Sequence, residues 1–162
     1  MKTIILTILS CIILISCNKT DTRNCCKGGK VAGTDSSIIA LPDIFTPNGD
    51  GINDFLYVQS KNISSLSIMI SNQRGNVVFQ STDMTQGWDG AYKGKKSKER
   101  EYSFSIDATT VNGKTLNLSG EICVVRDNCI KSPITNCVFD SQFNGNGFDK
   151  NIPSEESIKA CN

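Results

Sequence analysis

Residues 45–55 read Phe-Thr-Pro-Asn-Gly-Asp-Gly-Ile-Asn-Asp-Phe, and this stretch guides the interpretation of the rest of the chain. Glycine adopts positive φ angles at no steric cost, and Asn and Asp side chains hydrogen-bond to nearby backbone. We therefore expect a tight multiple turn here. A strand-like run, residues 55–58, follows it.

On both sides of this turn the hydrophobic pattern is typical of strands. Residues 66–71 and 102–108 alternate apolar and polar side chains. We expect residues 77–79 to form a hairpin with 66–71, and residues 115–126 to form one with 102–108. Asn112-Gly113 is a strong hairpin signal. From residue 17 onward, no stretch keeps a sustained helical period of apolar residues. The spacing predicts an all-β, Ig-like antiparallel β-sandwich of about seven strands over residues 38–126, with Trp88 over an open end of its core.

The N-terminus is typical of an export signal. Lys2 precedes an apolar run at residues 4–15, which is too short to span a membrane as a helix. The sequence Leu-Ile-Ser-Cys at 14–17 looks like a bacterial lipobox. We expect residues 1–16 to be a lipoprotein signal peptide and Cys17 to carry a covalent lipid, with an ordinary cleaved signal as the alternative. The small and polar residues 17–37 predict a flexible tether.

Six further cysteines follow Cys17, and an even number in an exported chain favours disulfides. Adjacent cysteines rarely bridge each other, so the first two are expected to reach different partners; the pairing is otherwise open. We expect the bonds to tie the tether to a loop-rich C-terminal tail, residues 127–162. Zinc is disfavoured, because the chain has no histidine and no C-x₂-C spacing. The six are Cys25, Cys26, Cys123, Cys129, Cys137 and Cys161.

Charge and composition argue against several functions. Lys and Arg number 17 and Asp and Glu number 16, so loss of Lys2 with the signal leaves a net charge of 16 − 16 = 0, and we expect no nucleic-acid partner. The basic run 93–100 is interpreted as a solvated turn, with a patch for anionic glycans or lipid headgroups as the alternative. Without histidine no Ser-His-Asp or Cys-His arrangement can form, so we expect no enzyme and no catalytic residue. Paired carboxylates for glycoside hydrolysis are the alternative, but Asp43, Asp50, Asp54 and Asp89 lie mostly in turn sequences, where Asp is common for structural reasons.

The turn raises the question of calcium. If Asn48 is placed at position 3 of an EF-hand loop, positions 1 and 12 are Thr46 and Tyr57, where Asp and Glu are needed, so that site is excluded. A looser calcium site at Asp50 and Asp54 is the alternative to carboxylates that cap backbone N–H groups. Residues 144–149 repeat the composition of 48–53, which we interpret as shared turn composition.

Five motifs occur in order along the chain: LPDIFTPNGDGIND at 41–54, ISNQRGNVVF at 70–79, GWDG at 87–90, YSF at 102–104 and CVVR at 123–126. In this order they resemble the gliding motility-associated C-terminal domain, the type B sorting domain of the Bacteroidota type IX secretion system. The resemblance covers about residues 38–126. Arg74 and residues 98–101 depart from the family pattern. The motif residues that carry the resemblance are Asn48, Gly49, Asp50, Gly51, Asn53, Asp54, Trp88, Asp89 and Gly90.

The resemblance implies a role in type IX secretion or gliding. In secreted cargo the domain follows a large passenger and ends the chain, whereas here a lipobox precedes it and a cysteine-containing tail follows. We therefore expect a non-catalytic, lipid-anchored envelope protein that acts as an accessory or structural subunit of an outer-membrane complex. We expect it at the cell surface, with the periplasmic face as the alternative. A type IX sorting or surface glycan-binding module is the alternative function.

Overall fold

The computed structural model describes residues 25–34, 36–126, 129–130, 137–149, 151–156 and 158–160. Within them the chain is all-β, with one short 3₁₀-helix and no α-helix, which confirms the predicted class. The elements are β1 (Lys30–Gly33), β2 (Ile38–Leu41), β3 (Ile44–Phe45), β4 (Gln59–Lys61), β5 (Ile63–Ser71), β6 (Val77–Ser81), β7 (Ala91–Tyr92), β8 (Lys95–Lys96), β9 (Arg100–Thr110), β10 (Thr115–Val124), β11 (Cys129–Ile130), η1 (Asp140–Gln142) and β12 (Lys159–Ala160).

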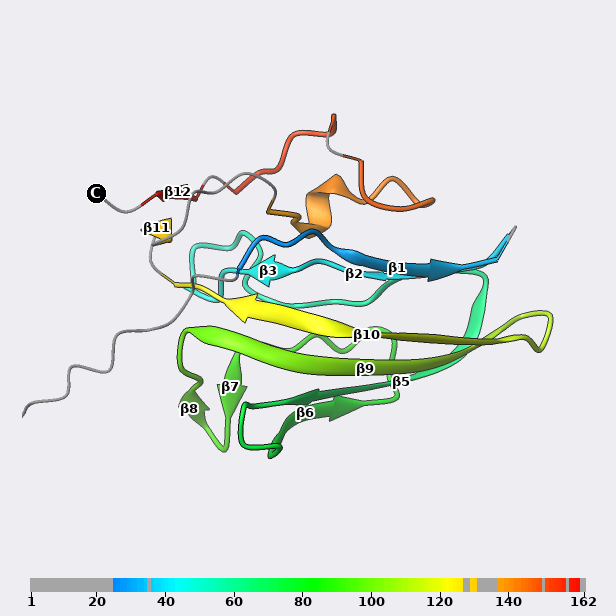
Figure 1. The fold of residues 1–162 in the computed structure, drawn as a ribbon, viewed down its shortest axis with the longest axis horizontal. Coiled ribbons are helices and arrows are strands. Elements are labelled where there is room, and N and C mark those ends of the chain that lie inside the picture. The colour runs from blue at the N-terminus through cyan, green and yellow to red at the C-terminus, as the bar shows by residue number, and fades with distance from the viewer. Residues whose placement is uncertain are drawn as a thin grey trace, which may run out of the picture.

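Two sheets form the sandwich (Figure 1). One has three strands in the order β1-β2-β4, and the other has five in the order β3-β10-β9-β5-β6. All pairs within these sheets are antiparallel except β3 with β10, which is parallel. Two small two-stranded sheets, β7-β8 and β11-β12, lie outside the sandwich. The strands of the two main sheets fit the predicted Ig-like sandwich.

The long β9–β10 hairpin forms the centre of the larger sheet. Its turn follows the Asn112-Gly113 signal: Gly113 has a φ of +76°, and Thr110 N–H donates to the Lys114 carbonyl at 2.8 Å. Alternate residues of both strands point into the core, as the period of two requires. The predicted pairing of residues 66–71 with 77–79 is also confirmed, as β5 and β6.

The main core lies between the sheets. Ile39 and Leu41 of β2 meet the inward residues of the larger sheet, among them Ile68, Ile70 and Ile106. Trp88, outside both sheets, is only 1% exposed in this cluster. Burial of these large apolar side chains is the main force that holds the sheets together.

Two sequence predictions are wrong in detail. Residues 30–33, assigned to a flexible tether, form β1, which pairs with β2 from Lys30↔Leu41 to Gly33↔Ile38. Backbone pairing with β2 orders this segment, although its four residues carry too little pattern to predict a strand. The run at 55–58 is not a strand of either sheet: only Leu56 pairs, as an isolated bridge with Trp88. The tether residues 17–24 lie outside the described part of the chain.

The C-terminal tail packs on the three-stranded sheet, with η1 above β1 and β2 in Figure 1. A Cβ on Gly29 would lie 2.5 Å from the Phe148 ring, so the ring sits directly on the backbone before β1. Lys61 Nζ of β4 donates to Asn146 Oδ1 at 3.3 Å. Phe139 of the tail is buried with Ile44 and Val125 in a second apolar cluster. The described residues of the tail are therefore part of the folded body.

Candidate functional site

Hydrogen bonds between side chains and backbone hold the turn at 48–54 in shape. The Asp54 carboxylate accepts from Gly49 N at 2.6 Å and from Gly51 N at 2.8 Å. Asn48 Oδ1 accepts from Asp50 N at 2.9 Å, and Asp50 Oδ1 accepts in turn from Ile52 N at 2.9 Å. In this turn the Asn and Asp side chains thus accept hydrogen bonds from the backbone N–H groups, as they do in Asx turns.

The same turn needs residues that tolerate positive φ. Gly49, Gly51 and Asn53 have φ angles of +92°, +91° and +49°. The turn is closed at its base, where Thr46 N donates to the Asn53 carbonyl at 3.0 Å. Glycine and asparagine adopt this conformation at the lowest cost, which explains why they occupy these positions.

These contacts bear on the calcium alternative. The carboxylates of Asp50 and Asp54 act as caps for backbone N–H groups, as described above. Among the described residues no group of three or more His, Cys, Asp or Glu side chains is arranged to hold a metal ion. Calcium at Asp50 and Asp54 remains an untested prediction.

Trp88 anchors the second motif. Its backbone exchanges two hydrogen bonds with Leu56, at 2.9 and 3.0 Å, and its indole N–H donates to the Ala91 carbonyl at 2.9 Å. Its ring lies 5.3 Å from Phe45 and 5.1 Å from Tyr102, measured between centroids. Aromatic pairs at these distances stabilise one another beyond their burial.

Asp89 and Gly90 turn the chain after Trp88. The Asp89 carboxylate accepts from Ala91 N at 2.9 Å. Gly90 has a φ of +70°, and a Cβ there would lie 2.7 Å from Cγ of Pro47. The two motifs, about 40 residues apart in sequence, are therefore in direct contact.

Arg126 holds the two motifs together. Its guanidinium donates to the carbonyls of Pro47 at 3.1 Å, Gly90 at 2.8 Å and Ser97 at 2.6 Å, while its backbone N–H donates to Glu99. Sequence reasoning treated Arg126 only as the end of the last strand. A charged residue directly after the buried Val124 and Val125 could have indicated that Arg126 has buried partners. The sequence could not identify those partners, because they lie far from Arg126 along the chain.

Two disulfides bind the segments that flank the sandwich: Cys25 is bonded to Cys123, and Cys26 is bonded to Cys137. The predicted disulfide bonding is confirmed for these pairs, and the adjacent cysteines reach different partners. One bond ends on β10 and the other on the tail. Cys129 begins β11, where it pairs in register with Lys159. Cys17 and Cys161 lie outside the described residues, so lipidation and the remaining pairing stay predictions.

Asp43 joins the same two segments without a covalent bond. Its carboxylate accepts from Gly28 N at 2.6 Å and from Val138 N at 2.8 Å, and the side chain is buried. Burial raises the pKa of this carboxyl, and the two backbone hydrogen bonds oppose that rise. Sequence reasoning placed Asp43 in a turn and missed that it bridges the tether and the tail.

Asp140 of η1 lies where the tail meets the turn. Its Oδ1 atom is buried and has no hydrogen-bond partner among the described residues. Burial raises the pKa of Asp140 to about 7, although hydrogen bonds from the Gln59 side chain and the Tyr57 backbone lower it. Asp140 also lines a hollow of about 230 Å³ that includes Asp54 and Tyr57.

Replacing Asp140 with Asn should therefore change how stability depends on pH. The folded-state pKa is raised above the unfolded value of 3.8, so the folded chain keeps this proton to higher pH. The protonated Asp140 side chain therefore contributes its full stabilisation of the fold below about pH 4, and this contribution is lost as the pH rises through about 7. At pH 8 we expect Asp140→Asn to be more stable than the wild type, by at most about 4 kcal/mol at about 1.4 kcal/mol per pKa unit.

Thermal unfolding at pH 5 and pH 8 measures this effect. The gain of Asp140→Asn should be larger at pH 8 than at pH 5. Asp83→Asn is the matched control, because hydrogen bonds from Thr85 lower the pKa of this exposed carboxyl. Equal stability of Asp140→Asn and wild type at pH 8 would contradict the raised pKa.

The fold and the motif contacts define a disulfide-bonded β-sandwich module whose signature residues build one rigid end of the domain. The model of the CHU_C type IX secretion signal domain family matches residues 39–124, which is more than half of the chain. The protein therefore belongs to this family, and the resemblance to a type IX sorting domain is confirmed. A search of the curated proteins finds no match.

Family membership has three consequences. It supports a role connected with type IX secretion, and it indicates a protein of the cell envelope or cell surface. The family is one of sorting signals and is non-catalytic.

In the part of the chain that the structure describes, no helix has the length and apolar character needed to cross a membrane.

Proposed function

We propose that this protein is a lipid-anchored envelope protein in which the sorting-type domain serves as a permanent accessory or structural subunit of an outer-membrane assembly linked to type IX secretion or gliding. The observation that carries the proposal is the covalent attachment of the N-terminal segment both to the domain and to the tail. Cys25 is bonded to Cys123 of β10, and the tail is bonded to Cys26.

These bonds favour a permanent subunit over a detachable address. A backbone cut between β1 and β2 would leave the N-terminal side bonded to β10 through Cys25. Asp43 adds hydrogen bonds to both segments, and β1 remains paired with β2. The domain and its flanking segments would therefore stay together at the membrane, as a structural subunit requires.

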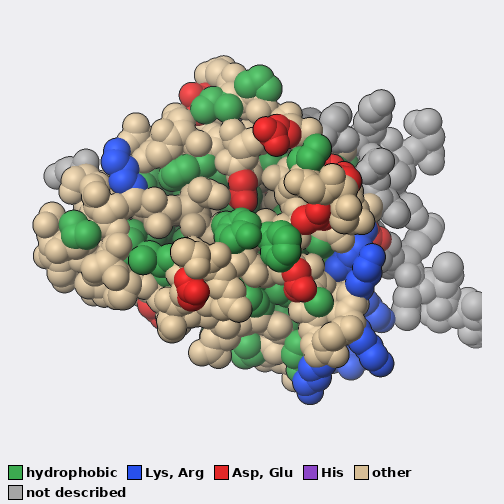
Figure 2. All heavy atoms as spheres, turned by 180° about the vertical axis from the view of Figure 1, so that it is seen from behind, with side chains coloured by type: hydrophobic (Ala, Val, Ile, Leu, Met, Phe, Trp, Pro, Cys, Tyr) green, Lys and Arg blue, Asp and Glu red, His purple; other side chains and the backbone are tan. Residues whose placement is uncertain are grey.

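The position of the basic hairpin, formed by β7 and β8 at residues 91–96, supports a lipid at Cys17. Cys123, the partner of Cys25, lies opposite Glu101 at the start of β9, directly after the basic run 93–100. On the face seen in Figure 2, most of the visible Lys and Arg side chains gather at one end of the molecule, at the lower right. Cys17 lies eight residues before Cys25, and eight extended residues reach at most about 28 Å. A membrane held within that distance would attract the exposed lysines through its anionic headgroups.

Replacing Cys17 tests the anchor. In cells, Cys17→Ala should abolish the acyl mass on the N-terminal peptide and shift the protein out of the membrane fraction, because the polypeptide alone would lack the acyl chains. Cys11→Ala is the matched control, because Cys11 lies in the same apolar run and should have no effect. An unchanged membrane fraction for Cys17→Ala would overturn the lipid anchor.

The assembly is tested separately. Gentle detergent extraction should recover the wild-type protein in stoichiometric complex with an outer-membrane barrel, and recovery as a lone monomer would overturn the subunit role. If the protein is instead sorted as type IX cargo, its surface display should vanish when that secretion machinery is deleted. Protease treatment of intact cells distinguishes the cell surface from the periplasmic face.

A further inference from the structure

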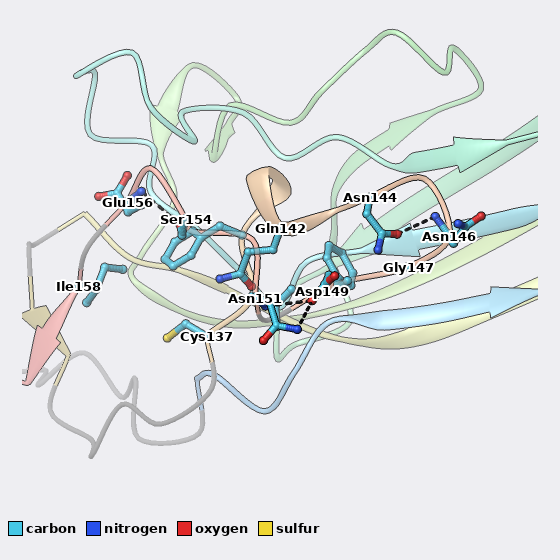
Figure 3. Close-up of a pocket in the computed structure, with 13 residues that line it drawn as sticks. Cys137, Gln142, Asn144, Asn146, Gly147, Asp149, Asn151, Ser154, Glu156 and Ile158 are labelled. Carbon is cyan, nitrogen blue, oxygen red and sulfur yellow. Dashed lines mark hydrogen bonds between the residues drawn. The ribbon is translucent and has the colours of Figure 1, made fainter.

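The C-terminal tail surrounds a hollow of about 740 Å³ (Figure 3). Its apolar wall includes Phe139, Phe148 and Ile158, and its polar groups include Gln142, Asp149 and Asn151. The motif loop and the basic hairpin contribute no residue to this lining. The hollow is therefore a separate site from the motif end of the sandwich.

Contacts at both ends of the tail hold the walls of the hollow in place. At the start of the tail, Cys137 is bonded to Cys26, and Val138 N donates to the buried Asp43. Near its other end, the Glu156 carboxylate accepts from Thr46 Oγ1 at 2.9 Å. A site whose walls are fixed before binding loses less conformational entropy when a ligand enters.

The loop within the tail is also ordered by its own hydrogen bonds. Phe143 and Phe148 form a β-bridge with their rings 5.8 Å apart, and Asn144 N donates to the Gly147 carbonyl at 3.0 Å. Asn144 Oδ1 accepts from Asn146 N at 2.9 Å, as Asn48 Oδ1 does from Asp50 N in the sandwich turn. The similarity of the two sequences thus extends to this local turn.

Several polar groups of the hollow have unused hydrogen-bonding capacity. Within the described ranges, the carboxamide group of Gln142 forms no hydrogen bond with another residue. Asp149 Oδ1 accepts both the backbone N–H of Asn151 at 2.9 Å and its Nδ2 at 3.0 Å. This leaves Asp149 Oδ2 and Asn151 Oδ1 as acceptors beside the carboxamide of Gln142, which both donates and accepts. Asp149 N also donates to the Gln142 carbonyl at 2.8 Å, so the two residues are neighbours in the hollow (Figure 3).

The charge of the lining restricts the class of ligand. Among the described residues that line the hollow none is Lys or Arg, while Asp149 and Glu156 are acidic, so this part of the lining disfavours an anionic ligand. Adjacent donors and acceptors suit hydroxyl groups, which do both, and the partly exposed phenyl ring of Phe148 suits the apolar C–H face of a sugar ring. We propose that this tail hollow binds a neutral saccharide. The site gives the glycan-binding alternative a location and does not depend on the lipid anchor.

A printed array of neutral and sialylated oligosaccharides, probed with the full-length protein in detergent, tests the site. We expect signals from neutral oligosaccharides and none that require sialic acid. Titration calorimetry with the best-bound oligosaccharide should then show at least about tenfold weaker binding for Gln142→Ala and for Asn151→Ala, because each removes hydrogen bonds to the ligand.

Asn76→Ala serves as the matched control, because Asn76 is an exposed carboxamide in the distant β5–β6 turn. It should bind like the wild type, and unchanged melting temperatures would show that the pocket variants are folded. A blank array overturns the proposal. Binding that persists in Gln142→Ala and Asn151→Ala but is lost in Lys95→Glu/Lys96→Glu would move the site to the basic hairpin and equally overturn it.

Discussion

Replacing Cys25, Cys26, Cys123 and Cys137 together with serine is expected to lower the free energy of unfolding by about 7 to 8 kcal/mol. The Cys25–Cys123 bond closes a loop of 98 residues, for which loop-closure entropy predicts about 4.7 kcal/mol. Once that loop is closed, Cys26–Cys137 closes only the short stretch from Cys123 to Cys137, about 15 residues, which adds about 3 kcal/mol. Many domains of this size have little more stability in total.

Removal of either pair alone should therefore cost only about 3 kcal/mol, because the remaining bond still closes the long loop. Urea unfolding without reductant of Cys25→Ser/Cys123→Ser, Cys26→Ser/Cys137→Ser and the fourfold variant measures all three values. The two pair variants act as controls for each other. If removal of one pair lowers the free energy of unfolding as much as removal of all four cysteines, the two bonds do not share the long loop.

Replacing Arg126 with alanine is expected to cost at least about 3 kcal/mol, since three carbonyls lose their donor. The guanidinium supplies the donors for the carbonyls of Pro47, Gly90 and Ser97, and each partly buried carbonyl left without a donor costs about 1 to 3 kcal/mol. Arg126→Lys should recover only part of this loss, since one ammonium group cannot reproduce the planar fork of a guanidinium.

Chemical denaturation of Arg126→Ala and Arg126→Lys measures this cost. Arg74→Ala is the matched control: Arg74 is exposed in the β5–β6 turn, and surface substitutions of this kind change stability by less than about 0.5 kcal/mol. If Arg126→Ala is as stable as Arg74→Ala, the guanidinium does not join the two motifs in solution.

Much of the sandwich could be predicted, because its strands follow local rules. The alternation of β5, β9 and β10 and the Asn112-Gly113 turn are properties of neighbouring residues. β1 could not be predicted in this way, because its four residues gain their order from pairing with β2. The motif turn was predicted correctly as a turn, because Asn and Asp act on backbone only a few residues away.

The candidate site was predictable only in part. The motif residues Asn48, Asp54 and Trp88 were identified from the family resemblance, but their contacts through Arg126 were not. The roles of Asp43 and Asp140 also escaped prediction, since burial and hydrogen bonds from distant segments set the pKa of each carboxyl.

Sequence alone was sufficient for the β-sandwich class, the family and the presence of disulfides, because each depends on local pattern, motif order or residue count. The tertiary structure alone decided which cysteines pair, that Arg126 joins the two motifs, and that the tail folds over β1 and β2 around a polar hollow. These features bring together residues far apart in sequence, such as Cys25 and Cys123, which are 98 positions apart. Their proximity arises only when burial of the common core fixes the two sheets and the tail in space.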